Sequence, residues 1–184
     1  MHPQLVSLTA EFQQAQDRLD RLAARLPHEQ WSRRPAPERW SVAECVAHLN
    51  LTARAFLPLL DVALAQARAL GGAAPRRYRH DPLGWLLWLS SGPPARLKSR
   101  TPAPFVPSGT ESPEALCKAF AQLQAEQVGC VRAADGLPLQ KVRIVSPFDA
   151  RVRYSLYSAL TILARHQQRH LWQAEQVAQA LAEG

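Results

Sequence analysis

Apolar residues recur every three or four positions over the first part of the chain, with polar residues between them. This spacing places the apolar side chains on one face of a helix, where neighbouring helices can bury them. The series runs through Leu5, Leu8, Phe12, Ala15, Leu19, Leu22 and Leu26. Pro27 follows, and proline cannot continue a helix because it lacks a backbone N–H. The pattern therefore predicts a first long helix over residues 5–26.

Three further long helices are predicted by apolar spacing together with start and stop signals. Ser41 and Glu44 have the spacing of a capping box, and the helical period that follows them ends at residues 71–72. Ser112, which a proline follows, starts a third helix that is expected to stop near residue 135. The fourth helix is expected from about residue 155 to residue 182.

The segments between these helices are rich in proline and lack a sustained period. Residues 28–39 are expected to be an ordered connection without helix. In the long crossover over residues 71–110, an apolar island predicts a short helix at about 82–90, and Lys98 to Pro107 are expected to form an extended strap. Residues 139–154 are interpreted as a linker that ends in a turn.

Composition supports a helical protein. Glycine is sparse and β-branched residues are few, whereas alanine, leucine, glutamine and arginine are abundant. The length of 184 residues suits a single domain that spans residues 1–184. The predicted fold class is therefore all-α. Four long helices, with a long proline-rich crossover between the second and the third, indicate a four-helix bundle.

The formal net charge of +7 indicates some attraction to anions. Much of this charge is local, because six basic and two acidic residues lie between Gly71 and Glu111. A nucleic-acid-binding role is disfavoured. Aromatic residues do not interleave with the charges outside the crossover, and the sequence has no helix-turn-helix, zinc-finger or RNA-binding signature.

Two features of the sequence, its few cysteines and its lack of long apolar runs, indicate in which compartment the protein is expected. Cys45, Cys117 and Cys130 are too few and too scattered for a disulfide framework or a zinc cluster, so reduced thiols are expected. No apolar stretch approaches the roughly 20 residues that span a bilayer, and the N-terminus has no basic region followed by an apolar run. We therefore expect a cytoplasmic protein without a membrane partner.

Three histidines are the candidate metal ligands. His166 and His170 are four residues apart, so both lie on one face of the predicted last helix and can point at one ion. His48 lies on the second predicted helix, and bundles build metal sites from facing helices. Each histidine taken alone is also compatible with a hydrogen-bonded residue at the edge of the core. Three imidazoles would suit zinc, nickel, iron or cobalt in an open site of the catalytic type.

The spacing of these residues resembles that of the DinB-like superfamily. The resemblance lies in two motifs, Trp40-Ser41-x-x-Glu44-x-x-x-His48-Leu49 and His166-x-x-Arg-His170-Leu-Trp-Gln173. The chain is most similar to the YfiT-like metal-dependent hydrolases and to the bacillithiol and mycothiol S-transferases. The resemblance implies an up-down-down-up four-helix bundle, a homodimer, and metal ligands at His48, His166 and His170.

The resemblance also implies a metal-dependent enzyme that activates a thiol or water. Its cofactor would be a divalent ion, zinc by preference and nickel or iron as alternatives, together with a low-molecular-weight thiol in the S-transferase type. Arg76, Arg77 and Arg79 could hold an anionic or thiol-containing small-molecule substrate, although a solvated face is the commoner role of such a cluster. The alternative function is a non-catalytic, metal-binding dimeric bundle with a stress-related or interaction role.

Residues near the histidines in sequence leave several roles open. Arg165 and Arg169 could clamp an anion or lie on the surface. Cys45, one turn before the first of the three histidines, could be a further ligand, but a helix cysteine there is more often a small core residue. No carboxylate is placed as an obvious general base, because Glu44 is expected to cap a helix and Glu175 lies beyond the site. The tryptophans of the crossover are expected to fill core or to contact a second subunit.

Overall fold

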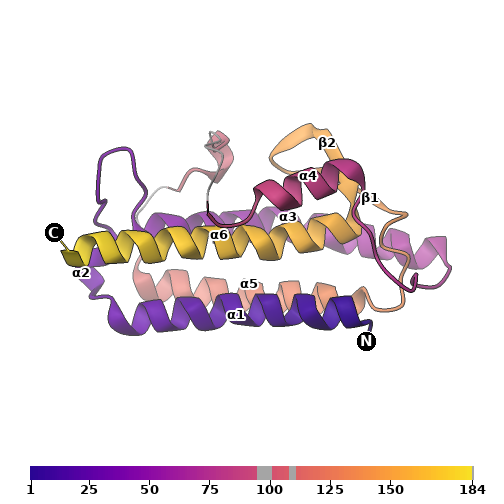
Figure 1. Ribbon diagram of the computed structural model, residues 1–184, viewed down its shortest axis with the longest axis horizontal. Coiled ribbons are helices and arrows are strands. Elements are labelled where there is room, and N and C mark those ends of the chain that lie inside the picture. Colours follow the sequence, from indigo (N-terminus) through magenta and orange to yellow (C-terminus); the bar gives the residue numbers. More distant parts are fainter. Residues whose placement is uncertain (95–100, 108–110, 184) are drawn as a thin grey trace.

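The computed structural model describes residues 1–94, 101–107 and 111–183, and its backbone is mostly helical. The body of the molecule consists of four long helices, α1 (Pro3–Arg25), α3 (Val42–Leu70), α5 (Pro113–Ala133) and α6 (Leu156–Glu183) (Figure 1). These bounds agree closely with the four predicted helices, so the prediction of a helical protein is confirmed. Within the described ranges, none of the helices combines the length and the apolar character needed to span a membrane.

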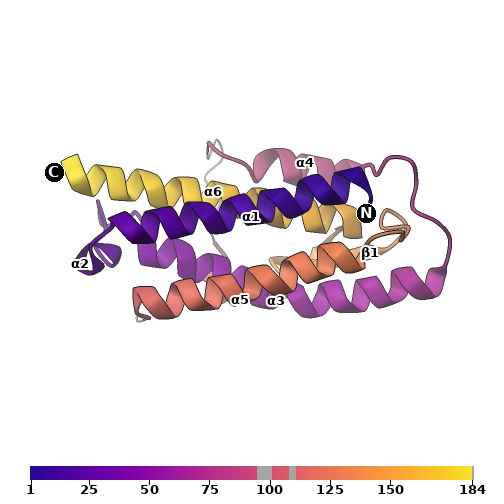
Figure 2. The same cartoon turned by 90° about the horizontal axis from the view of Figure 1, so that it is seen from below.

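The four long helices lie side by side, and each packs mainly against two others. α1 and α3 both pack against α5 and α6. α1 and α6 run in one direction along the long axis, whereas α3 and α5 run in the other (Figures 1 and 2). The whole apolar series expected for α1 is buried. This burial explains why the helix forms, because an amphipathic helix gains most of its stability from packing its apolar face.

The predicted helix starts are confirmed in atomic detail. The hydroxyl of Ser41 accepts a hydrogen bond from the N–H of Glu44, and the Glu44 carboxylate accepts one from the N–H of Ser41. Arg34 forms an ion pair with the same carboxylate. At the start of α5, the Ser112 hydroxyl accepts from the N–H of Ala115. These caps satisfy backbone donors that the first helical turn leaves without partners.

The interpretation of residues 139–154 as a linker that ends in a turn is wrong in part. β1 (Arg143–Ser146) and β2 (Asp149–Ser155) form an antiparallel hairpin, and the expected turn joins them. Ile144 and Tyr154 are cross-strand partners that the core buries. Such a short alternation of apolar and polar residues is a weak sequence signal, and packing of the inner face on the helices is what stabilises the hairpin.

Two short helical turns also depart from prediction. Residues 28–39 were expected to lack helix, but they begin with α2 (His28–Trp31), which buries Trp31. Within the expected extended strap, η1 (Ala103–Phe105) forms a 3-10 turn and buries Phe105. In both places a buried aromatic side chain accompanies a turn in a proline-rich segment. Lys98 and the rest of residues 95–100 lie outside the described residues, as do residues 108–110.

The short helix predicted within the crossover is confirmed as α4 (Pro82–Ser90), which packs on α6 and beside β2. Asp81 caps its first turn. The same carboxylate accepts hydrogen bonds from the N–H of Ser155 and the hydroxyl of Ser158 at the start of α6, at 2.8 and 2.9 Å. At the other end, Arg169 of α6 donates to the carbonyl of the last residue of α4 at 2.9 Å. Polar contacts with the α6 side therefore fix α4 at both ends.

A close approach in the first half of α4 requires glycine. A Cβ atom placed on Gly84 would lie 2.2 Å from Oγ and 2.4 Å from Cβ of Ser158. We expect Gly84→Ala to lower the free energy of unfolding by about 1–3 kcal/mol, which is the usual cost of overpacking. Urea denaturation followed by circular dichroism measures the change.

The matched control is Gly129→Ala. Gly129 is exposed on α5, and an added Cβ would have no neighbouring atom within 4 Å. Because alanine favours a helix over glycine, this substitution is expected to stabilise the protein by about 0.5–1 kcal/mol. If Gly84→Ala behaves like Gly129→Ala, α4 does not approach α6 as described.

Candidate metal centre

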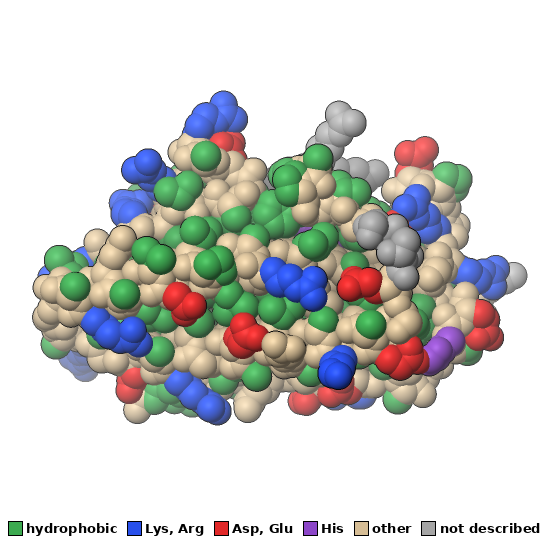
Figure 3. Space-filling view, turned by 180° about the vertical axis from the view of Figure 1, so that it is seen from behind, with side chains coloured by type: hydrophobic (Ala, Val, Ile, Leu, Met, Phe, Trp, Pro, Cys, Tyr) green, Lys and Arg blue, Asp and Glu red, His purple; other side chains and the backbone are tan. Residues whose placement is uncertain are grey.

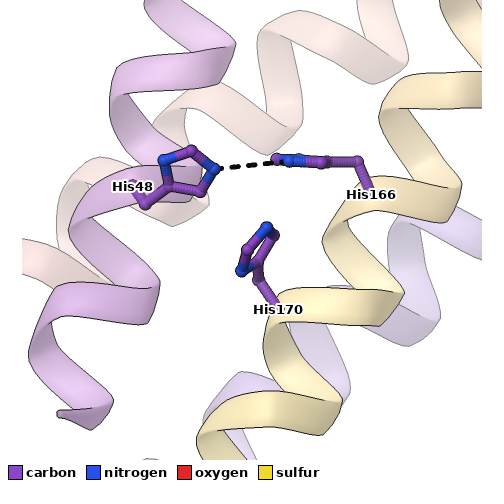
Figure 4. Close-up of side chains that lie close together, drawn as sticks. All are labelled: His48, His166 and His170. Carbon is purple, nitrogen blue, oxygen red and sulfur yellow. Dashed lines mark hydrogen bonds between the residues drawn. The ribbon is translucent and has the colours of Figure 1, made fainter. Parts of the chain in front are cut away.

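His48 of α3 and His166 and His170 of α6 point toward one another where the two helices meet (Figure 4). Each offers one ring nitrogen, and these three atoms all lie within 4.8 Å of one another. His166 and His170 are one helical turn apart, so both rings lie on the side of α6 that faces α3. The structure thus brings together the three histidines selected from the sequence. Over the described parts of the chain, no other group of three or more potential ligands is this compact.

Hydrogen bonds to protein oxygens orient two of the three rings. Nδ1 of His48 lies 2.8 Å from the backbone carbonyl oxygen of Phe105, which can only accept, so Nδ1 carries the proton. Nδ1 of His170 donates in the same way to Oε1 of Gln173 at 3.0 Å. Both rings therefore keep an unprotonated Nε2 for the centre of the cluster. Metal-binding histidines in proteins are usually oriented through the second ring nitrogen in this manner.

The spacing of His48 and His166 fits two ligands of one ion. Their Nε2 atoms are 3.3 Å apart, and two nitrogens at about 2.0–2.1 Å from a tetrahedral zinc ion are separated by roughly that distance. Nδ1 of His166 is buried without a hydrogen-bond partner among the described residues. With its proton on that atom, His166 would direct its Nε2 lone pair at that of His48. A cation between the two lone pairs makes this arrangement favourable.

All three imidazoles are held in the neutral form. Burial lowers the pKa of His48, although its hydrogen bond to Phe105 opposes the change. Burial and the neighbouring histidines, together with Arg169, lower the pKa of His166 well below its ordinary value. Burial, His48 and Arg169 lower the pKa of His170 to about 3. Neutral imidazole is the form that binds metal, so no proton has to leave these rings at neutral pH.

Aromatic rings surround the histidines. The ring centroid of Trp40 lies 5.0 Å from that of His48. The ring of Phe148, from the turn of the hairpin, lies 5.9 Å from His166 and 4.3 Å from Phe105. These rings make the surroundings apolar, and an apolar environment strengthens electrostatic interactions within the cluster.

The candidate carboxylates and the candidate cysteine are used elsewhere. Glu44 caps α3 and pairs with Arg34. Glu175 forms an ion pair with Arg18 of α1 at 2.7 Å. Cys45 is buried in the core, and burial raises the pKa of its thiol. The interpretations of Glu44 as a helix cap and of Cys45 as a small core residue are therefore confirmed.

Arg165 and Arg169 both contact α4, and the basic group of the crossover lines a separate groove. Cζ of Arg165 lies 4.1 Å from the ring centroid of Trp88 in a cation–π contact, so Arg165 holds α4, as Arg169 does through its hydrogen bond. The basic group of the crossover lines a groove beside the start of α1, formed by His2, Pro3, Gln4, Pro75, Arg76, Arg77 and Arg79. None of the three histidines lines this groove.

Three residues of the site were not assigned a role from the sequence. Phe105 contributes a backbone carbonyl, and sequence patterns give no signal for such a contact. Phe148 reaches the site through the hairpin, which was itself not predicted. Gln173 could have been found, because it follows His170 by three residues and therefore lies on the same face of the helix.

A match to a known family covers most of the chain. The family model described as the DinB superfamily matches residues 11–174. Searches of the curated proteins and of the solved structures gave no significant match. The matched span includes all three histidines of the cluster and both sequence motifs. The chain belongs to the DinB superfamily.

Proposed function

We propose that this DinB protein is a metal-dependent enzyme that activates a small thiol, with His48, His166 and His170 as ligands of one divalent ion. The observation that carries the proposal is the convergence of three neutral imidazoles, with 3.3 Å between the Nε2 atoms of His48 and His166. In this proposal the four long helices act as an up-down-down-up bundle that holds the ligands. Zinc suits three nitrogen ligands best, with nickel or iron as alternatives.

Three protein ligands leave coordination positions open, as in catalytic rather than structural sites. A divalent ion bound there would supply Lewis-acid chemistry that lowers the pKa of a thiol or of water. The protein groups favour the thiol. The described residues place no carboxylate in the cluster as a general base, and a thiol, with an ordinary pKa of about 8.5, loses its proton far more readily than water does.

The protein residues would orient the reactants and exclude water. Phe105 and Gln173 keep the rings of His48 and His170 from rotating, through hydrogen bonds to Nδ1. The apolar ring of Trp40 favours an electrophile with an apolar part. In the reaction, the thiolate sulfur would form a bond to the electrophilic carbon while the leaving group departs with the electron pair of the broken bond.

A conjugation assay on tag-free protein tests this proposal, since a histidine tag would bind metal itself. Protein loaded with zinc, nickel or iron is mixed with a low-molecular-weight thiol and an aromatic halide, and loss of the thiol is followed. We expect a rate above the uncatalysed one that disappears on chelation and in His48→Ala.

The same assay separates the two candidate functions. Protein that binds metal near one ion per chain but accelerates neither thiol conjugation nor ester hydrolysis would contradict an enzymatic role. It would favour the non-catalytic metal-binding alternative. Hydrolysis without conjugation would show that water is the activated nucleophile.

A further inference from the structure

α4 carries apolar residues on both of its faces. Its inner face, which includes Gly84 and Trp88, packs on α6. Its outer face is formed by Pro82, Trp85, Leu86 and Leu89, which recur at helical spacing and are exposed. Trp85, Leu86 and Leu89 are 52%, 56% and 50% exposed. Single exposed apolar residues are common, but a stripe of this kind indicates a binding surface. We name these four residues the α4 stripe.

The fold holds the α4 stripe outward by contacts that do not involve it. Asp81 joins the start of α4 to the start of α6, and Arg169 bonds the carbonyl of its last residue. The close approach of Gly84 to Ser158 fixes the helix between these two points. α4 is therefore attached through its ends and its inner face, and the apolar residues of the stripe are left facing solvent.

Exposed arginines lie beside the α4 stripe. The hairpin that contacts α4 exposes Arg143, Arg151 and Arg153, and in Figure 1 the hairpin and α4 stand on the same side of α3 and α6. The two acidic residues of this region pair with two of these arginines, Asp81 with Arg143 and Asp149 with Arg151, so the region has an excess of one positive charge. The Arg143 and Arg151 side chains remain 58% and 90% exposed in these pairs and can still meet a charged ligand. In the view from behind, acidic and basic side chains are interspersed over the surface (Figure 3).

A second copy of the chain is a poor occupant for this surface. Four half-exposed side chains provide much less than the roughly 800 Å² per partner that a stable protein–protein interface buries. A symmetric contact would also bring hairpin arginines of one copy near those of the other, and like charges disfavour association.

We propose that the α4 stripe and the three hairpin arginines form a peripheral binding surface for membranes that contain anionic lipids. Tryptophan and leucine side chains enter the boundary between head groups and acyl chains. Arginines beside them meet the negative head groups. The expectation of no membrane partner rested on the lack of a spanning segment, and a helix that lies on the membrane surface needs none.

Vesicle co-sedimentation with the full-length protein tests this proposal. The probes are vesicles of phosphatidylcholine alone and of phosphatidylcholine mixed with phosphatidylglycerol. We expect binding to the mixed vesicles that weakens as salt is added. The variant Trp85→Ser/Leu86→Gln/Leu89→Gln is expected to bind at least about tenfold more weakly. Arg151→Gln/Arg153→Gln should lower binding to the mixed vesicles and reduce its dependence on salt.

The matched control is Val62→Gln/Leu70→Gln, which changes two exposed apolar residues of α3 away from the α4 stripe. Its vesicle binding should equal that of wild type. The α4 stripe variant should keep its circular dichroism spectrum and its metal content, because Trp85, Leu86 and Leu89 are at least half exposed and belong neither to the described buried clusters nor to the histidine group. This readout separates the membrane surface from the proposed enzymatic function.

Two outcomes would overturn the membrane proposal. The first is wild-type protein that does not sediment with the mixed vesicles. The second is a wild-type dimer in analytical ultracentrifugation that the α4 stripe variant dissociates without any difference in vesicle binding. The stripe would then be a contact between copies of the chain.

Discussion

Replacing His170 by alanine is expected to weaken divalent metal binding by more than about 100-fold. Changing an outer partner that only orients a metal ligand typically costs about 10–100-fold in affinity, and loss of the ligand itself should cost more. His48 and His166 would remain, but two imidazoles hold an ion less firmly than three. Mass spectrometry of tag-free protein and competition with a coloured chelator measure metal content and affinity.

The control for this prediction is His28→Ala. His28 is an exposed histidine that pairs with Glu114 at 2.7 Å, away from the cluster. The His28→Ala variant should bind divalent metal with the affinity of wild type. Equal metal content in wild type and His170→Ala would show that the three histidines do not form one site.

Metal should also stabilise wild type but not His170→Ala. An ion at about 1,000 times its Kd adds about 4 kcal/mol to the free energy of unfolding, which for a protein of this size raises Tm by roughly 8–16 °C. A histidine that only filled the core would change the Tm of metal-free and metal-loaded protein equally. The rise in Tm on adding metal therefore distinguishes a ligand from a packing residue.

Asp81→Asn is expected to lower the free energy of unfolding by about 2–4 kcal/mol, although the two side chains are nearly the same size. One carboxylate oxygen accepts from the N–H of Ser155 and the hydroxyl of Ser158, and the other accepts from the N–H of Gly84 and from Arg143. The amide nitrogen of asparagine would face donors in either orientation. Each buried donor without an acceptor costs about 1–3 kcal/mol.

The effect of Asp81→Asn should depend on pH in a defined direction. Burial alone would raise the pKa of Asp81, but hydrogen bonds from Ser155, Ser158 and Gly84 outweigh burial and lower it. A lowered carboxyl pKa stabilises the folded state above the ordinary value of about 3.9, and this contribution is lost as pH falls through the lower folded-state value. The difference in free energy of unfolding between wild type and Asp81→Asn should therefore be largest at neutral pH and become smaller below about pH 4.

Urea denaturation at neutral and acidic pH measures this difference. Asp149→Asn is the control, because Asp149 begins β2, the strand whose last residue Asp81 contacts, but among the described residues it pairs only with its exposed neighbour Arg151. Its unfolding midpoint should stay close to that of wild type. Coincident midpoints for wild type and Asp81→Asn at neutral pH would contradict the role of Asp81 in joining α4, β2 and α6.

The long helices could be predicted because their signals are local. The apolar series of α1, the capping box of Ser41 and Glu44, and the Ser112 start of α5 each depend on residues within a few positions of one another. The same holds for the His166 and His170 pair, whose shared face follows from helical geometry. A long helix can therefore be predicted wherever apolar residues recur every three or four positions and a capping signal precedes them.

The hairpin and the two short turns were missed for the opposite reason. Ile144 and Tyr154 stabilise the hairpin because the core buries them, and a four-residue alternation does not show which face is buried. Trp31 and Phe105 accompany turns whose conformation depends on contacts with distant residues. The contacts of Arg165 and Arg169 likewise could not be predicted, because they depend on where α4 packs.

By itself, the sequence determined the helices, the pairing of His166 with His170 on one face, and His48 as the third candidate. Only the tertiary structure decided that His48 meets His166, 118 positions away, and that the carbonyl of Phe105, 57 positions away, orients its ring. The physical reason is that helical periodicity acts over a few residues. The distance between two side chains on different helices is set by how every layer of the core packs between them.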